Sequence, residues 1–378
     1  MMTKRILHII ENLDDEYGGP AKSVPSLVYA LSKYFDNTIV TTSRYSKLNN
    51  ESLAKSSLNV YSFKCSIFKI YFSYSLLKFL IKSISSRNYD LVHFHSIWTL
   101  PTWIGYLLCR FYSIPYVISA RSNFYKDSLV RGSFKKKFIL KTVLKGIFDN
   151  CSFIHVTAKD EEVELNSIDY KGQVVLSPNG IDYDAFDHEN SQESFTYLYM
   201  GRIHPRKNLD ILIDAFIKFK INNSNWSLQL CGPIEDQDYF NFLKRKVENS
   251  GMQKDVKFNG MLVGEERIKA FTGASCLVLA SKFENFGMVI GEAMAAGKPV
   301  IVSEGTPWQI VESRDAGFWI KADANTFAKA MKEFSELPCA RRLEMGSNAR
   351  AIIVECFSWE KVVLPIVDSY REILDGDF

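Results

Sequence analysis

The segment Ser281–Ile301 constrains the fold more than any other part of the chain. The apolar run Cys276–Ala280 comes directly before it and predicts a buried strand. Phe286–Ala296 has a helical pattern that ends at Gly297, and Val300–Val302 begins another apolar strand. A strand, a loop, a helix and a second strand in this order are typical of a parallel α/β sheet.

The start of that helix is suited to an anion. Its first amides, around Gly287–Val289, have no partner within the helix and lie at the positive end of its dipole. Glu284 lies just before the helix, and Glu292 lies about two turns inside it. Two acids beside an anion site fit a ligand that carries hydroxyl groups on both sides of a phosphate, and a nucleotide sugar is such a ligand.

Strands alternate with helices through both halves of the chain, which predicts an α/β fold with parallel sheets. In the first half we expect strands at Arg5–Ile10, Thr38–Thr42, Val60–Phe63, Asp90–Phe94, Pro115–Ser119, Ser152–Val156 and Gln173–Leu176. Turn residues at Ser177–Gly180 interrupt the pattern, and it then restarts. The further strands are expected at Phe195–Met200, Trp226–Leu230, Val256–Phe258, Cys276–Ala280, Val300–Val302 and Gly317–Ile320.

Two halves of similar size predict two Rossmann-like domains that face each other. We place an N-terminal domain at 1–178, a nucleotide-sugar-binding domain at 179–356, and a helical segment at 357–378 that packs back on the first domain. Pro365 lies inside the final helix, Trp359–Leu374, and predicts a kink. Because ligands bind beyond the carboxyl ends of parallel strands, functional side chains are expected in the loops that follow them.

Composition excludes several classes of protein. The chain has 378 residues, a net charge of +3 and seven irregularly spaced cysteines, which argue against a disulfide framework. His93 and His95 alternate on a strand, but no further Cys or His cluster completes a zinc site, and we predict no metal. The N-terminus lacks a signal-peptide pattern, and lysines interrupt the apolar region Ile67–Ile84. We therefore expect a cytoplasmic protein.

Basic residues concentrate in the first half, most of all at Ser133–Phe148. On a helix, Lys137, Lys141 and Lys145 would lie along one side. This pattern fits a solvated amphipathic helix, or a helix that rests on anionic lipid at the inner face of the cell membrane. A nucleic-acid surface is a weaker interpretation because no binding motif accompanies the charge, so we expect no nucleic-acid partner.

Two basic side chains follow the first strand of the second half. Arg202 comes directly after Gly201, and Lys207 lies five residues later. Arg and Lys in this position suit a diphosphate, although basic residues in a loop are more often only solvated. Glu284 and Glu292 lie in the same half of the chain, and their presence favours the interpretation that Arg202 and Lys207 bind a diphosphate.

Polar residues also follow strands of the first half. His95 follows one strand, and Arg121 and Asn123 follow the next. Gly18-Gly19, between the first strand and its helix, would let a ligand approach the backbone. His95 could be a packed structural histidine or could contact a sugar hydroxyl. We find no dinucleotide fingerprint, P-loop or nucleophile elbow.

Together these motifs resemble the retaining glycosyltransferases of family 4, which have the two-domain GT-B architecture. The motifs that carry the resemblance, in the family's order, are Gly18-Gly19-Pro20, His95, Pro178–Asp182, Gly201-Arg202, Lys207-Asn208, Glu284 with Glu292, and Gly297–Pro299. Tyr116–Phe124 and Gly305–Trp308 are similar to bacterial surface-polysaccharide members of the family.

The resemblance implies catalytic roles for Arg202, Lys207, Glu284 and His95. Arg202 and Lys207 would bind the donor diphosphate and stabilise the departing nucleotide. Glu284 would contact the hydroxyls of the transferred sugar, and His95 would contact that sugar from the acceptor side. The leaving phosphate would accept the proton of the incoming hydroxyl, which would explain why no pair of carboxyl groups of the glycosidase kind is evident. The first domain would bind the acceptor, and we expect no metal or other cofactor.

The resemblance also implies a set of donor-binding residues, in which Glu292 accepts hydrogen bonds from the ribose. The set is Gly19, Phe286, Gly287, Met288, Val289 and Glu292. Arg121 and Asn123 are expected on the acceptor side.

The implied function is transfer of a hexose or N-acetylhexosamine, with retention, from a UDP- or GDP-sugar to a lipid-linked oligosaccharide. The setting would be the biosynthesis of lipopolysaccharide O-antigen, capsule or exopolysaccharide. Two alternatives stay open: a nucleotide-sugar epimerase of the same fold, and a non-catalytic sugar-binding subunit of a polysaccharide assembly complex. Asn285 stands where many relatives have Gly or Pro, which leaves the donor's identity open.

Overall fold

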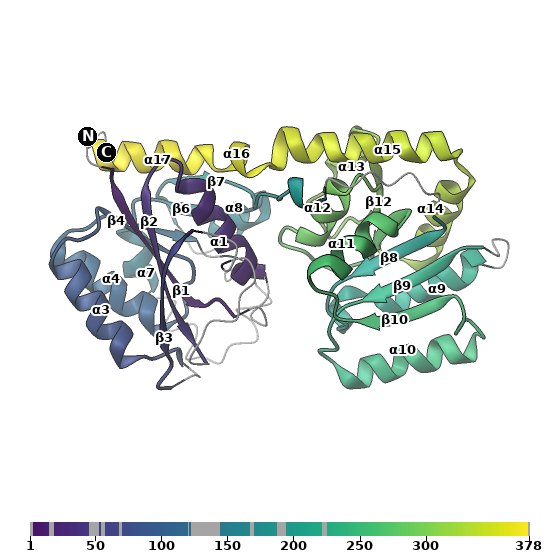
Figure 1. The fold of residues 1–378 in the computed structure, drawn as a ribbon, viewed down its shortest axis with the longest axis horizontal. Coiled ribbons are helices and arrows are strands. Elements are labelled where there is room, and N and C mark those ends of the chain that lie inside the picture. Colours follow the sequence, from purple (N-terminus) through teal and green to yellow (C-terminus); the bar gives the residue numbers. More distant parts are fainter. Residues whose placement is uncertain are drawn as a thin grey trace. The chain divides into compact units, whose positions relative to one another are not determined.

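The chain folds into two compact α/β units. The computed structural model describes residues 3–14, 19–44, 53, 57–67, 70–119, 121, 144–166, 170–186, 194–220 and 225–376. One unit is Met1–Gly180 together with Trp359–Phe378, and the other is Ile181–Ser358. Each unit contains one sheet of parallel strands (Figure 1). The predicted pair of Rossmann-like domains is therefore confirmed.

The first unit has a seven-stranded sheet in the order β3-β2-β1-β4-β5-β6-β7. Its strands are β1 Arg5–Asn12, β2 Asp36–Ser43, β3 Asn59–Lys64, β4 Leu91–Phe94, β5 Tyr116–Ser119, β6 Ile154–Val156 and β7 Val174–Leu176. Its helices before the second unit are α1 Gly19–Leu31, α3 Tyr74–Ser85, α4 Leu100–Tyr112, α7 Lys145–Asp149 and α8 Lys159–Asn166. The strand order reverses between β1 and β4, which places the crevice of this sheet at their carboxyl ends.

Both faces of this sheet are covered, which explains the nearly continuous apolar runs of its strands. Along β1, Leu7 and Ile9 pack in one cluster with residues of α3 and α4. Ile6 points to the opposite face and packs with residues of α1 and of the C-terminal helix, α17 (Leu364–Asp375).

The C-terminal segment packs on the first unit as predicted, but it forms two helices, α16 Trp359–Val362 and α17 Leu364–Asp375. Pro365 lies in the first turn of α17, where the missing N–H would have no helical partner in any case. The predicted kink is therefore a break between two helices. Ile366, Val367 and Tyr370 are buried against the sheet.

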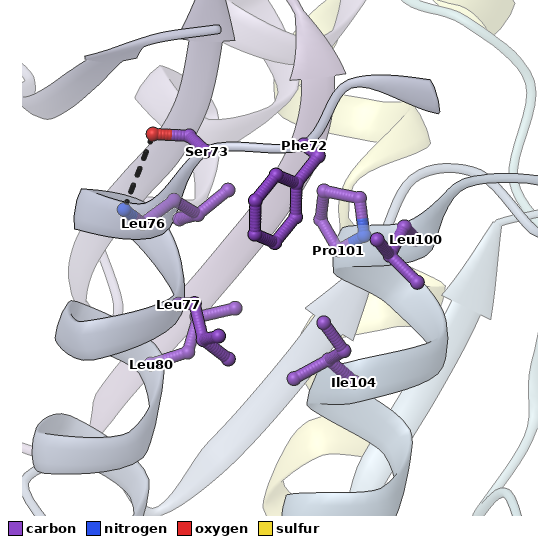
Figure 2. A pocket seen from close by; sticks show the side chains of 8 residues that line it. All are labelled: Phe72, Ser73, Leu76, Leu77, Leu80, Leu100, Pro101 and Ile104. Carbon is purple, nitrogen blue, oxygen red and sulfur yellow. Dashed lines mark hydrogen bonds between the residues drawn. The ribbon is translucent and has the colours of Figure 1, made fainter. Parts of the chain in front are cut away.

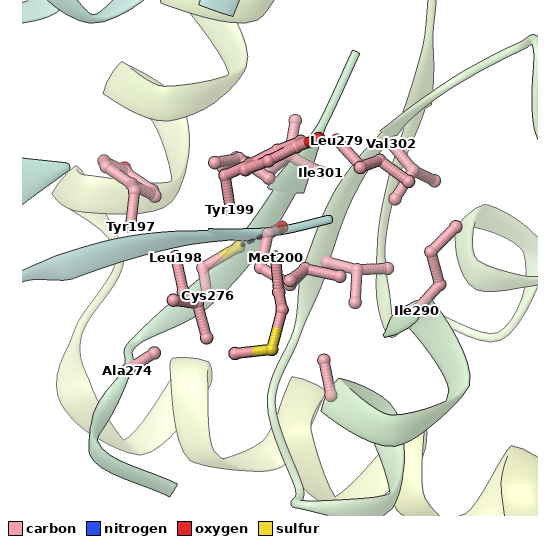
Figure 3. Packing of buried hydrophobic residues seen from close by; sticks show 14 of the residues in the cluster. Tyr197, Leu198, Tyr199, Met200, Ala274, Cys276, Leu279, Ile290, Ile301 and Val302 are labelled. Carbon is pink, nitrogen blue, oxygen red and sulfur yellow. Dashed lines mark hydrogen bonds between the residues drawn. The ribbon is translucent and has the colours of Figure 1, made fainter. Parts of the chain in front are cut away.

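The second unit has a six-stranded sheet in the order β10-β9-β8-β11-β12-β13. Its strands are β8 Thr196–Met200, β9 Ser227–Cys231, β10 Val256–Gly260, β11 Cys276–Leu279, β12 Val300–Ser303 and β13 Gly317–Ile320. Its helical elements are η4 Asp184–Phe186, η5 Pro205–Lys207, α9 Leu209–Lys220, α10 Gln237–Asn249, α11 Gly264–Gly273, α12 Met288–Ala295, α13 Ile310–Ser313, α14 Ala324–Glu336, α15 Cys339–Ile352 and η6 Ile353–Phe357. Tyr197, Cys276 and Ile301 belong to its buried core, part of which Figure 3 shows.

Sequence analysis missed α15. The helix buries only Met345, Gly346, Ala349 and Ile352, and because Gly346 and Ala349 are small, these four do not form a visible apolar stripe. At 14 residues it is the longest helix in the described part of the chain. No described helix is both long enough and apolar enough to span a membrane.

Candidate functional site

The predicted donor residues lie at the carboxyl edge of the second sheet. β8 and β11 are paired neighbours in that sheet, and the strand order reverses between them. Gly201 and Arg202 follow β8, and Glu284 lies in the loop between β11 and α12. In open α/β sheets this reversal point is where ligands bind.

Backbone contacts hold the two loops together at this edge. The amide of Lys282 donates to the carbonyl of Arg206 over 3.0 Å. Asn208, in the left-handed conformation with φ 50°, donates its side-chain amide to the Ala280 carbonyl over 2.9 Å. The turn that carries Lys207 is therefore fixed against the loop that carries Glu284.

Lys207 and Glu284 form an ion pair in this setting. Their side chains are only 17% and 13% exposed, so water screens the pair less than it would a surface pair. Ser281 Oγ donates to Glu284 Oε1 over 2.7 Å, and Lys207 Nζ donates to the same oxygen. Among the described contacts, this leaves Glu284 Oε2 for another donor, such as a sugar hydroxyl.

The backbone at the start of α12 is suited to the close approach of a ligand. Gly287 caps the helix with φ 78°, a left-handed conformation that favours glycine. Trp308, which is fully buried, donates its indole N–H to the carbonyl of Phe286. The amides of Met288 and Val289 then begin the helix without helical partners.

Glu292, in the second turn of α12, pairs with Arg267 of α11. Their side chains are 17% and 19% exposed, and the Arg267 guanidinium also lies 5.3 Å from the centre of the Phe271 ring. Sequence analysis did not single out Arg267. Only the packing of α11 beside α12 brings it to Glu292, and no local pattern marks it.

Arg202 lies on the open side of the site. Its Nη1 is 2.9 Å from Glu235 Oε1, with side chains 60% and 41% exposed. Arg202, Lys207 and Arg267 thus each face one carboxylate. A diphosphate can compete most easily for Arg202, because an exposed pair contributes little.

The first unit carries a buried histidine cluster at its own reversal point. His8 of β1 and His93 of β4 are register partners, and His95 follows β4 directly. His8 Nδ1 lies 3.0 Å from His95 Nε2, and His8 Nε2 lies 3.0 Å from Asn37 Oδ1.

The hydrogen bonds that link Asn37, His8 and His95 form one network, and they assign the tautomers of the two histidines. The Asn37 amide nitrogen donates to the Phe35 carbonyl over 3.0 Å, so Asn37 Oδ1 must accept from His8 Nε2–H. His8 Nδ1 then accepts from His95 Nε2–H. His95 Nδ1 is left as a buried acceptor with no hydrogen-bond partner.

In a second hydrogen-bonded network of the same unit, every histidine nitrogen has a partner. His155 Nε2 donates to the Ser177 carbonyl over 2.8 Å, so His155 Nδ1 accepts from the Ser119 hydroxyl at 2.6 Å. His93 Nε2 donates to Ser119 Oγ, and His93 Nδ1 accepts from the Tyr370 hydroxyl, both at 2.6 Å. Of the histidines in these two hydrogen-bonded networks, His95 alone has a ring nitrogen without a hydrogen-bond partner.

Two family models match the chain and together extend from residue 17 to residue 352. The model of Glycosyltransferase Family 4 matches residues 17–185. The model of Glycosyl transferases group 1 matches residues 181–352. The chain belongs to glycosyltransferase family 4. It is a transferase.

Known glycosyltransferases show similarity over most of the chain. An uncharacterized glycosyltransferase of Methanocaldococcus jannaschii is 26% identical over 303 residues, 75% of each chain. The D-inositol 3-phosphate glycosyltransferase of Streptomyces avermitilis is 26% identical over 226 residues, 54% of this chain and 48% of the relative. The structure of Anabaena HepE with UDP and glucose aligns with a TM-score of 0.76 at 18% identity, covering 99% of this chain and 100% of that one. The structural similarity confirms the GT-B fold.

The structure describes only some of the other residues that sequence analysis predicted for this glycosyltransferase, all of them in the first unit. Gly19 opens α1, and Arg121 donates to Ser23 Oγ over 2.7 Å. Asn123 and residues 133–143 lie outside the described residues, whereas Ile147 and Phe148 are buried in α7. The acceptor-side roles and the membrane role of 133–148 stay predictions.

The histidine cluster bears on the predicted absence of a metal. Sequence analysis found no further histidine or cysteine that could join His93 and His95 as a metal ligand. That was wrong, because the fold brings His8 to them. The three residues offer ligand atoms within 4.8 Å of one another, as three metal-binding histidines can. A metal there would have to replace hydrogen bonds that His8 and His93 already make. A metal-free glycosyltransferase stays our prediction.

If His95 contacts the sugar as predicted, replacing His8 with Phe should lower kcat about tenfold, because His95 would lose the acceptor that fixes its tautomer and so the orientation of that predicted contact. ¹⁵N NMR should show the His95 proton on Nε2 in the wild type and a mixture of the two neutral tautomers in the variant. His8→Gln, whose amide oxygen can accept from His95, should recover most of the activity. A wild-type His95 protonated on Nδ1 would contradict the assignment.

Proposed function

We propose that this glycosyltransferase moves a hexose or N-acetylhexosamine, with retention, from a UDP- or GDP-sugar to a lipid-linked oligosaccharide. The observation that carries the donor class is the arrangement of two largely buried ion pairs, Lys207–Glu284 and Arg267–Glu292, on either side of the start of α12. Anabaena HepE with UDP and glucose supports the same class of ligand. The setting we propose is O-antigen, capsule or exopolysaccharide assembly on the cytoplasmic side of the membrane.

The geometry supports different roles for different residues along the donor. Arg202, Lys207 and the free amides of Met288 and Val289 suit the diphosphate, because they supply charge and donors at one edge. Glu292 suits the ribose hydroxyls. Glu284, with Oε2 available, suits the transferred sugar.

In the proposed reaction the bond between the sugar's anomeric carbon and the β-phosphate oxygen breaks. The acceptor hydroxyl oxygen forms the new bond on the same face, and its proton passes to the departing phosphate. The protein's main contribution would be to stabilise the negative charge that grows on the diphosphate. This route uses no pair of carboxyl groups of the glycosidase kind and no metal.

Replacing Glu235 with Gln is expected to improve donor binding about twofold to fivefold, because Arg202 would no longer be shared with an exposed carboxylate. Isothermal titration with UDP and GDP measures the effect. Glu355→Gln is the matched control, since Glu355 pairs with Arg314 at similar exposure in the same unit. Equal or weaker binding by the Glu235 variant would argue that Arg202 does not reach the diphosphate.

A nucleotide-release assay with UDP- and GDP-sugars, with and without membrane lipid extract, tests the proposal. We expect release that depends on lipid extract, and a product whose anomeric configuration by NMR matches the donor. Conversion of the donor without nucleotide release would indicate an epimerase. No turnover of any donor would favour a non-catalytic sugar-binding subunit.

A further inference from the structure

We infer that the outer surface of helices α3 and α4 docks on a membrane that contains anionic lipid. The inference rests on the proposed function for its biological purpose, since a lipid-linked acceptor lies in a membrane. Its physical basis is separate and comes from the side chains that these two helices expose.

Helix α3 exposes an apolar and basic stripe. Tyr74 is 58% exposed, Ile81 is 44% exposed, and Lys78 and Lys82 are exposed beside them. Lys78 Nζ lies 4.7 Å from the centre of the Tyr74 ring, so cation and ring lie on the same side of the helix. The opposite side, with Leu76, Leu80 and Ile84, is buried against the sheet.

Helix α4 repeats the pattern. Phe111 is 79% exposed, the highest value among the large apolar side chains of the described residues, and Leu107 is 62% exposed. These two lie one turn apart, and the exposed Arg110 lies beside Phe111. Tyr106 and Cys109 point the other way, into the core.

The two helices form one surface. They pack against each other on the same face of the first sheet. Figure 2 shows the apolar depression between them, where Leu77 of α3 faces Ile104 of α4 and Phe72 lies at the upper end. The loop before α3 exposes Ile67 and Ile70 as well.

The charge on this surface has one sign. Neither helix contains Asp or Glu, and Asp90 is the one acid among the described residues between 57 and 119. Asp90 accepts a hydrogen bond from the Arg5 amide, at the start of β1. Lys78, Lys82 and Arg110 are therefore not neutralised by acids of these helices.

Exposed aromatic and aliphatic side chains ringed by cations match a lipid surface. The apolar groups can enter the boundary between headgroups and acyl chains, while the cations stay at the anionic headgroups. A second copy of the same surface would bring like charges together, which makes self-association a poorer fit. Anionic lipid satisfies both features at once.

Sedimentation with vesicles tests the inference without any need for turnover. We expect the wild type to bind vesicles of phosphatidylcholine mixed with phosphatidylglycerol, to bind phosphatidylcholine alone weakly, and to be released by salt. Lys78→Ala with Arg110→Ala should weaken binding about thirtyfold, and Leu107→Ser with Phe111→Ser about tenfold or more. Phe242→Ser is the control, because Phe242 is 45% exposed on α10 of the other unit.

Each remaining outcome has a definite meaning. No binding to either vesicle, equal binding to both, or binding that the four substitutions leave unchanged would overturn the inference. A dimer in light scattering that the same substitutions disperse would assign the surface to self-association instead and would also overturn it. Thermal unfolding shows that the variants are folded, and titration with UDP and GDP reports on the donor site independently. Nucleotide binding with no vesicle binding would reject this surface alone, and the reverse result would reject the proposed donor site alone.

Discussion

Replacing Lys207 with Ala is expected to lower kcat for nucleotide release by about 10²–10³, as removal of one preorganised donor at a developing anion typically does. Lys207 is fixed by the tie between the Arg206 carbonyl and the Lys282 amide, so its ammonium needs little rearrangement to meet a phosphate. Initial rates at saturating UDP- or GDP-sugar measure the effect. A loss below about threefold, less than about 0.7 kcal/mol, would contradict the role.

Stability has to be separated from catalysis in this test, because Lys207→Ala leaves Glu284 without its cation in a largely buried position. Lys220→Ala is the matched control, since Lys220 also forms a largely buried pair, with Asp255. It should reduce the free energy of unfolding and leave kcat unchanged. The double change Lys207→Ala with Glu284→Ala should recover stability without recovering activity.

The free energy of unfolding is expected to fall by at least about 4 kcal/mol between pH 7.5 and pH 5, about 2 kcal/mol each from His8 and His155. Burial lowers the pKa of His8 and of His155 from 6.5 to about 4. The unfolded chain therefore binds protons first as the pH falls. The stabilisation is complete above pH 6.5 and is lost progressively as the pH falls from about 6.5 toward about 4. Burial, followed by neighbouring positive charge, also lowers the pKa of His93 and His95.

Urea unfolding at the two pH values measures this loss. His155→Gln keeps a hydrogen-bonding side chain but removes one titrating group, so its loss should be about 2 kcal/mol smaller than that of the wild type. The exposed-site variant Lys332→Ala should behave like the wild type. Stability that stays constant over this range would mean that the histidines are not buried in neutral form.

Local patterns were enough to predict the alternation of strands and helices and the placing of Glu284 and Glu292 around the start of α12. Those features depend on the residues between β11 and β12 alone. They did not reveal Arg267 or His8, whose roles depend on which helix or strand becomes a neighbour. The same limit explains the missed α15, because it buries only four residues, two of them Gly346 and Ala349, and tertiary packing rather than a local apolar pattern selects them.

Local rules also misjudged Pro365. A proline inside an apolar helical pattern predicts a kink, but the chain uses it to begin α17 after the short α16. The result fixes Tyr370 over the sheet, where its hydroxyl reaches His93. The C-terminal segment thus takes part in the hydrogen-bonded chain that leaves His95 as the histidine with an open nitrogen.

A crystal structure of the protein with bound UDP or GDP tests the central claim most directly. We predict a diphosphate within hydrogen-bonding distance of Arg202 and Lys207, and a ribose whose hydroxyls donate to Glu292. A nucleotide bound away from the edge of the sheet formed by β8 and β11, with the Lys207–Glu284 and Arg267–Glu292 pairs untouched, would contradict it.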